Sequence, residues 1–258
     1  MDINKIVDIL IDAEENCKEI TKITDDEPEL NHSNAYDVQH HLVEKKLADG
    51  AKVIGMKMGL TSRAKMEQMG ISDPLYGHLF DYMQVENHGQ VSMGDLIHPK
   101  VESEIAFIFS KDLSGNNLSD SEIVDALQYA VPVMELVDSR FKNFNFTLPD
   151  VIADNCSSSR YVVGDKMTDV KKLPFDQLNV SLSINGEVVD KGKGSAVLGH
   201  PFASIRELAK MLSRRGLTIP KGYIILTGGI TKAYIIKSGD QVKTSVEKLG
   251  DVSFNVVE

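Results

Sequence analysis

Residues 98–109 of the chain read His98-Pro99-Lys100-Val101-Glu102-Ser103-Glu104-Ile105-Ala106-Phe107-Ile108-Phe109. The second half of this stretch is apolar and partly branched, which is typical of a buried strand. Successive side chains of a strand point to opposite faces, so we expect Glu102 and Glu104 on the same face. Two such carboxylates repel each other and lose hydration, and a cation between them relieves both costs. The stretch predicts a site for a hard divalent cation, Mg²⁺ or Mn²⁺; the alternative is a solvated pair on an edge strand.

A third carboxylate lies in the middle of an apolar run within residues 133–141, which also predict a buried strand. A glutamate in such a run is costly unless another group compensates its charge, so Glu135 is the natural third ligand. The carboxylate of Asp138, later in the same predicted strand, is instead expected to pair with Arg140 as a structural contact.

A lysine at the end of an earlier predicted strand is a candidate anion-binding residue. Residues 51–58 predict this strand, and Gly59 follows it before a short helix expected over 63–69 and capped by Ser62. The N-terminus of a helix attracts anions, so Lys57 is well placed to help bind one. The alternative is a lysine that extends into solvent.

Hydrophobic spacing and turn residues predict the remaining elements. These are helices over 3–19, 33–50 (capped by Ser33), 119–130 (ended by Pro132) and 199–212, a loop over 21–32, a turn over 73–77, strands at 161–163 and 223–226, a hairpin of 178–184 and 187–191, and final strands at 241–246 and 252–257. We expect an α+β fold with a helical N-terminal subdomain (1–80). A β-rich catalytic domain (81–258) would follow, whose mixed sheet curves into a barrel-like roll.

Charge and composition exclude several classes of protein. The formal net charge is −10 and basic clusters are nearly absent, which argues against a nucleic-acid partner. No apolar run approaches the length of a membrane span, and the first residues lack the basic and apolar regions of a signal peptide. Cys17 and Cys156 have neither metal-ligand spacing nor a disulfide framework, so we expect a cytoplasmic protein with reduced thiols.

Six motifs spread along nearly the whole chain resemble those of one enzyme family and occur in the same order. They lie at residues 57–62, 98–106, 135–140, 153–158, 198–201 and 227–231. The chain thus resembles the hydratase/decarboxylase family of the meta-cleavage pathways for aromatic degradation, which is related in fold to the fumarylacetoacetate hydrolases. The resemblance implies a metal-dependent lyase that needs no organic cofactor.

The resemblance also implies a role for individual residues. It implies Mg²⁺ (or Mn²⁺) ligands at Glu102, Glu104 and Glu135, an active-site lysine at Lys57, and a substrate pocket near Asp81, Ser157 and Thr231. The amino acids at positions 82–84 and at Ser103 differ from the family pattern, but none of these positions is an implied ligand.

The family has two main branches, 2-keto-4-pentenoate-type hydratases and 4-oxalocrotonate (2-oxo-3-hexenedioate) decarboxylases. Residues 57–70, 73–77 and 227–231 are more similar to the decarboxylases, and Leu75 stands where hydratases tend to carry an aspartate. The resemblance therefore implies decarboxylation of a small 2-oxo dicarboxylic acid, 2-oxo-3-hexenedioate, to 2-hydroxypenta-2,4-dienoate and CO₂. Hydration of that dienoate is the alternative.

The resemblance further implies that the chain forms homo-oligomers and associates with a sister hydratase. A second alternative is therefore a mainly non-catalytic scaffold that stabilises a partner. The intact glutamates and Lys57 argue against this alternative, because a scaffold needs no metal site.

Overall fold

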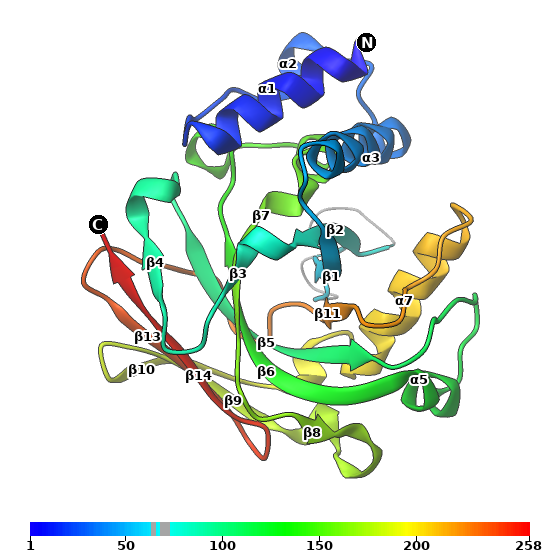
Figure 1. Ribbon diagram of the computed structural model, residues 1–258, viewed down its shortest axis with the longest axis vertical. Helices are drawn as coiled ribbons and strands as arrows, with labels where there is room; N and C mark the ends of the chain where they lie inside the picture. The colour runs from blue at the N-terminus through cyan, green and yellow to red at the C-terminus, as the bar shows by residue number, and fades with distance from the viewer. Residues whose placement is uncertain (63–65, 68–72) are drawn as a thin grey trace.

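The computed structural model describes residues 1–62, 66–67 and 73–258 (Figure 1). Its helices are α1 (Ile3–Glu15), α2 (Ile23–Asp26), α3 (His32–Ala48), α5 (Asp120–Ala126), α6 (Leu148–Ala153) and α7 (Pro201–Ser213). Its strands are β1 (Val53–Gly59), β2 (Leu75–Phe80), β3 (Gln84–Val85), β4 (Gln90–Ser92), β5 (Lys100–Phe109), β6 (Leu127–Val137), β7 (Ser158–Val163), β8 (Thr168–Asp169), β9 (Asn179–Ile184), β10 (Glu187–Lys193), β11 (Ile224–Leu226), β12 (Tyr234–Ile235), β13 (Gln241–Val246) and β14 (Gly250–Val257).

Within the described residues, these strands form two sheets. The larger sheet has nine strands in the order β2-β1-β11-β5-β6-β7-β3, with β12 paired to β5 and β8 to β6. Its pairings are parallel for β1–β11 and β3–β7 and antiparallel for β5–β6, so the sheet is mixed. The smaller sheet has five strands in the order β10-β9-β13-β14-β4. The larger sheet curls around the centre of the molecule, which confirms the expected α+β fold with a curved mixed sheet (Figure 1).

Strands β5 and β6 are the longest in the structure and run through the middle of the larger sheet. Because β11 and β7 flank them, β5 is not an edge strand, and the alternative of a solvated Glu-x-Glu pair is wrong. The outer face of the pair is apolar: Val101 and Leu136 belong to a core cluster with Leu182 and Phe254 of the smaller sheet. The other face is left for the candidate site.

The N-terminal helices cover one end of the larger sheet (Figure 1). Helix α3 contacts both α1 and α6, and apolar residues of α1 such as Leu10 share one core cluster with Met58 of β1 and Phe107 of β5. Burial of this apolar surface is the main force that attaches the helices to the sheet. No helix in the described parts of the chain is long and apolar enough to cross a membrane.

The structure corrects some of the expected elements. The expected turn at 73–77 is largely strand, because β2 begins at Leu75 and pairs antiparallel with β1. The expected loop over 21–32 contains the short helix α2, and Asn31 rather than Ser33 caps α3. The helix expected from residue 63 lies mostly outside the described residues.

The most informative correction concerns Pro132, which was expected to end a helix but lies inside β6. Its carbonyl accepts from the backbone N–H of Gly164, so its nitrogen points to the same side of the strand. On that side β7 ends at Val163, and β8 begins opposite Ala130. Since no neighbouring strand requires an N–H there, proline does not interrupt the sheet.

The division into two domains near residue 80 stays a prediction. Strands β1 and β2, which precede that boundary, pair within the same sheet as β5 and β6.

Candidate metal centre and substrate cavity

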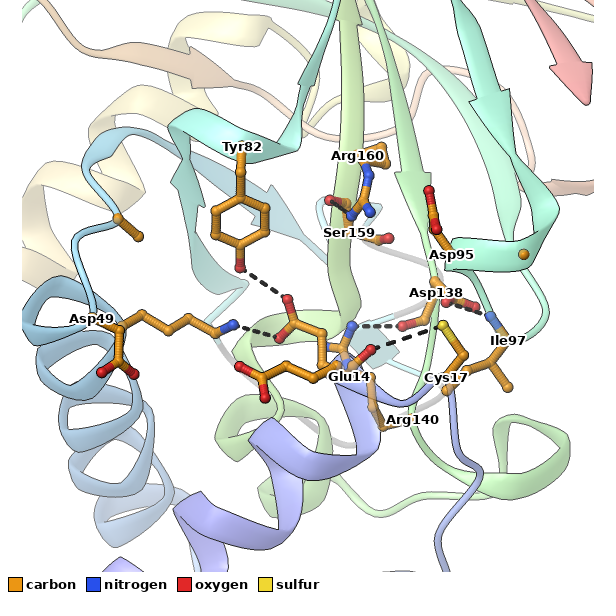
Figure 2. Close-up of a pocket in the computed structure, with 14 residues that line it drawn as sticks. Glu14, Cys17, Asp49, Tyr82, Asp95, Ile97, Asp138, Arg140, Ser159 and Arg160 are labelled. Atoms are coloured by element: carbon orange, nitrogen blue, oxygen red, sulfur yellow. Dashed lines mark hydrogen bonds and ion pairs between the residues drawn. The ribbon is translucent and has the colours of Figure 1, made fainter.

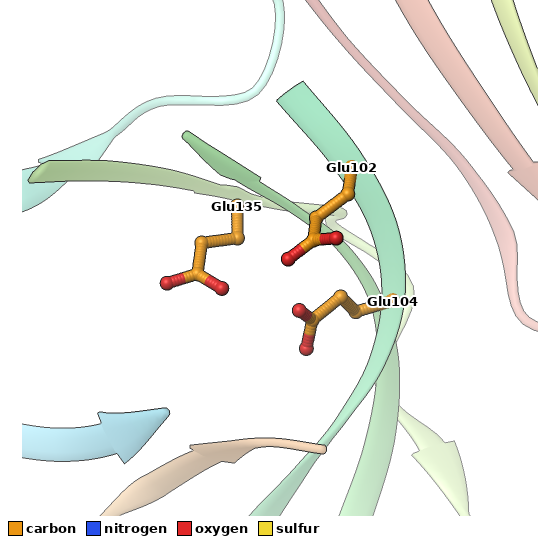
Figure 3. A group of neighbouring side chains, drawn as sticks. All are labelled: Glu102, Glu104 and Glu135. Atoms are coloured by element: carbon orange, nitrogen blue, oxygen red, sulfur yellow. The ribbon is translucent and has the colours of Figure 1, made fainter. Parts of the chain in front are cut away.

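The register of β5 and β6 brings three carboxylates together (Figure 3). Glu102 is directly opposite Glu135 across the antiparallel pair, and Glu104 follows two residues later on the same face of β5. Directly opposed side chains in such a pair have Cβ atoms only about 5 Å apart. One carboxylate oxygen of each glutamate lies within 4.8 Å of the others, as a shared cation requires.

These carboxylates have more acceptor capacity than the protein satisfies. Glu104 and Glu135 are fully buried, and among the described residues nothing donates a hydrogen bond to Glu104 Oε1 or Glu135 Oε2. Burial, together with the negative charges of Glu135 and Glu102, raises the pKa of Glu104 well above its usual range. Buried oxygens without donors are costly, and the all-oxygen donor set suits a hard divalent cation, so the residues fit Mg²⁺ or Mn²⁺.

A glycine-containing loop after β11 closes one side of the cluster. The backbone N–H of Gly228 donates to Glu104 Oε2 at 2.7 Å, and Gly228 has a φ of +110°. A Cβ added to Gly229 would lie 2.2 Å from Glu102 Oε2, so a larger residue there would displace the Glu102 carboxylate. The hydroxyl of Thr231 accepts from the backbone N–H of Ser103 at 3.0 Å, which ties the loop to β5 between the two glutamates.

Lys57, on β1, also borders the cluster. Its Nζ lies 2.9 Å from Glu135 Oε1 and donates to the carbonyl of Cys156 at 3.1 Å. Burial is the largest single influence on the pKa of Lys57 and would lower it, but the acidic groups around it, Glu135 first, together outweigh burial and raise the pKa above the usual value. Lys57 is 3% exposed, so the alternative of a solvent-exposed lysine is wrong.

A left-handed turn presents Cys156 and Ser157 to the site. Asn155, Cys156 and Ser157 have φ values of 47°, 53° and 56°, each of which costs a residue with a side chain about 1–2 kcal/mol. Such a run persists only where contacts hold it, and it is typical of functional sites. The side chain of Asn155 makes two hydrogen bonds to the backbone of His78, at 2.7 Å and 2.9 Å.

Arg140 holds the other side of this turn. Its guanidinium donates to the carbonyls of Asp154 at 2.7 Å and Ser158 at 3.0 Å, and its Nε pairs with the Asp154 carboxylate. The expected Arg140–Asp138 ion pair is therefore wrong. The carboxylate of Asp138 instead accepts the backbone N–H groups of Ile97 and His98, because the chain turns there into β5.

A cavity of about 250 Å³ opens beside the glutamates. Its lining combines charged groups at the cluster with mainly apolar walls: Lys57, Gly59, Leu60, Leu75, Lys100, Glu102, Val137, Phe144, Phe146, Val151, Cys156, Ser157 and Ala233. Ser157 is buried, and its hydroxyl has no hydrogen-bond partner among the described residues. The cavity thus joins the carboxylates and Lys57 to a largely apolar space that could hold a small ligand.

Asp81 is the one predicted site residue that the described structure separates from this group. It is exposed, at the end of β2, and its carboxylate accepts the backbone N–H groups of Lys52 and Tyr82. It does not line the cavity beside the glutamates. Thr231 is near the cluster, but its hydroxyl is already used by Ser103.

A second cavity, of about 360 Å³, lies between the N-terminal helices and the ends of β6 and β7 (Figure 2). The Glu14 carboxylate in this cavity is already engaged: it pairs with Lys46 at 3.0 Å and accepts from the hydroxyl of Tyr82 at 2.9 Å. Among the described residues, none of the buried polar atoms without partners belongs to this cavity. The candidate site is therefore the cavity beside the three glutamates.

The sequence reasoning missed Lys100 and Phe144. Lys100 precedes Glu102 by two residues, so the alternation that placed Glu102 and Glu104 on one face also places Lys100 there. No comparable signal exists for Phe144, which reaches the cavity from a short 3₁₀ turn (Lys142–Phe144) with left-handed residues.

Comparison with known proteins identifies the relatives of the chain. The family model "Fumarylacetoacetate (FAA) hydrolase C-terminal" matches residues 76–257. A 4-oxalocrotonate decarboxylase of Pseudomonas sp. (strain CF600) is 46% identical over 85% of this chain and 83% of the relative. A 2-keto-4-pentenoate hydratase of Paraburkholderia xenovorans (strain LB400) is 34% identical over 86% of this chain and 82% of the relative.

Solved structures give the same result. A 4-oxalocrotonate decarboxylase from Pseudomonas putida G7, complexed with magnesium and adipate, has a TM-score of 0.96 and 42% identity, covering 99% of this chain and 97% of that one. The resemblance drawn from the six sequence motifs is thus confirmed.

The unsatisfied carboxylates lead to a prediction for Glu104→Gln. We expect its Mg²⁺ or Mn²⁺ affinity, measured by isothermal titration calorimetry, to fall at least about tenfold, because an amide is a weaker and uncharged ligand. Glu187→Gln, an exposed change on β10, is the matched control and should bind metal normally. Wild-type metal affinity in Glu104→Gln would remove Glu104 from the ligand set.

The raised pKa of Glu104 gives a second prediction for Glu104→Gln, which concerns the pH dependence of stability in the absence of metal. Because the pKa of Glu104 is raised in the folded protein, the metal-free wild type binds more protons folded than unfolded. Its stability should therefore fall as the pH rises from the ordinary carboxyl pKa toward the raised one. The melting temperature of metal-free Glu104→Gln should fall less over this pH range than that of metal-free wild type. An equal fall in both proteins would contradict a raised pKa of Glu104.

Proposed function

The chain belongs to the fumarylacetoacetate hydrolase family, and on this basis we propose that it decarboxylates 2-oxo-3-hexenedioate to 2-hydroxypenta-2,4-dienoate and CO₂ in the degradation of aromatic compounds. The observation that carries the proposal is the cluster of Glu102, Glu104 and Glu135, which faces a small, mainly apolar cavity beside Lys57. The names of the more similar relatives support the decarboxylase over the hydratase.

We assign the three glutamates as ligands of a divalent cation, Mg²⁺ or Mn²⁺. Their geometry, the buried oxygens without donors and the magnesium complex of the relative from Pseudomonas putida G7 support this assignment. When bound there, the cation supplies Lewis-acid chemistry toward the carboxylate and 2-oxygen of a 2-oxo acid. The role of the protein is to hold three carboxylates in place and to leave the side facing the cavity open to the substrate.

The substrate is chemically suited to such a site. In 2-oxo-3-hexenedioate a double bond is conjugated to the 2-oxo group. The departing carboxylate is attached to the carbon next to this double bond. As the C–C bond to this carboxylate breaks, its electron pair moves through the double bond onto the 2-oxygen, and CO₂ leaves. Negative charge therefore develops at the end of the substrate that lies nearest the glutamates.

In this proposal Lys57 stabilises the charge that develops on the 2-oxygen. Its ammonium is buried, fixed between Glu135 and the carbonyl of Cys156, and lines the cavity. A preorganised donor in a site that excludes water contributes about 3 kcal/mol to the stability of the transition state. The hydroxyl of Ser157 has a free donor for the substrate, whereas the engaged hydroxyl of Thr231 supports a positioning role.

Leu75 distinguishes the two branches in chemical terms. A hydratase must deliver a proton and a water to the diene, and so needs an acid–base group near the far end of the substrate. Leu75 lines the cavity at the start of β2, and its side chain cannot transfer protons. An apolar wall also disfavours the charged carboxylate relative to neutral CO₂, which assists its departure.

Self-association, a complex with a sister hydratase and a cytoplasmic location stay predictions from the sequence. Light scattering after size-exclusion chromatography, of the chain alone and mixed with the hydratase, tests the first two.

Lys57→Ala tests the proposed role of the lysine. We expect kcat to fall about a hundredfold, the scale of one lost electrostatic donor, while metal affinity changes little because an ammonium is not a ligand. Lys52→Ala, at an exposed position shortly before β1, is the control. A normal kcat in Lys57→Ala would exclude Lys57 from the reaction.

Product analysis tests the reaction itself. Wild-type protein should release CO₂ from 2-oxo-3-hexenedioate, lose this activity in a chelator and regain it with Mg²⁺ or Mn²⁺, while hydrating 2-hydroxypenta-2,4-dienoate poorly. Leu75→Asp should slow decarboxylation at substrate concentrations below KM, because a second carboxylate repels the departing one and weakens substrate binding. Rapid hydration of the dienoate without CO₂ release from the diacid would make the chain a hydratase.

A further inference from the structure

Lys100 lies at the outer end of the same strand face as the glutamates. It is the first residue of β5, two residues before Glu102, and its side chain lines the cavity. Glu104 marks the buried end of this face, so a ligand that reaches the glutamates extends outward past Lys100. Lys100 therefore adjoins the part of the cavity that the far end of a ligand would occupy.

An aromatic ring holds the lysine in this position. The Nζ of Lys100 lies 3.6 Å from the centroid of the Phe144 ring, a cation–π contact. The same ring also contacts His98 and Phe146, with ring centroids 4.6 Å and 6.4 Å away. Phe144 itself has a left-handed φ of 54°, which is costly for a bulky residue and indicates a position that its surroundings enforce.

Among the described residues around the cavity, Lys100 has no acidic partner within ion-pair distance. Lys57, the other lysine of the lining, is paired with Glu135. Lys100 makes no ion pair within 4.0 Å in the described part of the chain. Counting only the described residues that line the cavity, a divalent cation and Lys57 would balance the three glutamates, and Lys100 is the remaining cation for the charge of a bound dicarboxylate. A carboxylate moved from water into apolar surroundings needs such compensation.

We propose that Lys100 binds the distal carboxylate of a 2-oxo dicarboxylic acid whose 2-oxo end is held at the glutamates, and that it makes the site selective for diacids over monoacids. This inference rests on the proposed function, because it assumes that a 2-oxo acid binds at the glutamate cluster. A charge-assisted contact of this kind is worth a factor of about ten or more in affinity.

The chemistry of the reaction predicts which kinetic constant, KM or kcat, changes when Lys100 is lost. The distal carboxylate is the group that leaves as neutral CO₂, so its attraction to Lys100 weakens as the bond breaks. An interaction that is stronger in the ground state than in the transition state favours substrate binding and does not increase kcat. Loss of Lys100 should therefore raise KM for the diacid without lowering kcat.

A pair of ligands tests the inference by equilibrium binding. 2-Oxoadipate and 2-oxohexanoate have the same chain length and the same 2-oxo acid end, and they differ only in the distal carboxylate. With Mg²⁺-loaded wild type, calorimetry should show at least about tenfold tighter binding of 2-oxoadipate. Lys100→Met should lose this preference while binding 2-oxohexanoate within about twofold of wild type.

Three further variants complete the experiment. Lys100→Arg keeps the charge and should retain the preference for the diacid, and Lys221→Met, an exposed change far from the cavity lining, should leave both affinities unchanged. Lys100→Gln replaces the methionine variant if that variant does not fold. The inference would be overturned if the uncharged variants kept the preference for 2-oxoadipate, or if they lost affinity for both ligands equally.

The kinetics separate this inference from the proposed function. In Lys100→Met, KM for 2-oxo-3-hexenedioate should rise about tenfold or more while kcat stays equal to or above that of wild type. A lower kcat with unchanged KM would overturn the inference but leave the decarboxylase intact. Absence of CO₂ release from wild-type protein would refute the proposed function, whereas the binding comparison would still report on Lys100.

Discussion

Mutual repulsion among three carboxylates, two of them fully buried and the third partly buried, is the constraint on which the rest of the site depends. It arises from the register of one strand pair, which sets Glu102 opposite Glu135 and Glu104 two residues further along. Like charges directly opposite each other destabilise a sheet, and burial increases the cost. The arrangement is understandable as a site that a divalent cation completes, and it explains why Lys57 lies against Glu135 and the N–H of Gly228 donates to Glu104.

The backbone around this cluster contains strained, left-handed residues that position its neighbours. The left-handed run Asn155–Ser157 directs a carbonyl to Lys57 and a hydroxyl to the cavity, and Arg140 holds the run in place. On the far side, the left-handed Phe144 supports Lys100. Residues from strands β1, β5 and β6 and from two strained turns thus converge on one small cavity, with positive groups at both ends of it.

The sequence predicted the parts of the structure that depend on local pattern. Alternation in residues 98–109 placed Glu102 and Glu104 on one face, and an isolated charge in an apolar run identified Glu135. Pro132 was misread because its tolerance depends on where β7 ends, and Arg140 was given the wrong partner because Asp154 becomes its neighbour only in the folded chain. Long-range packing also decides that Asp81 lies apart from the cavity and that Phe144 borders it.

The most direct test of the account is anomalous diffraction from crystals of the protein soaked with Mn²⁺ and 2-oxoadipate. The account predicts one anomalous peak within coordination distance of Glu102, Glu104 and Glu135, with the 2-oxo acid end of the ligand completing the shell. It also predicts a distal carboxylate that extends into the cavity lined by Leu75 and Lys100. A peak elsewhere, or well-occupied ligand density that does not touch the metal, would contradict it.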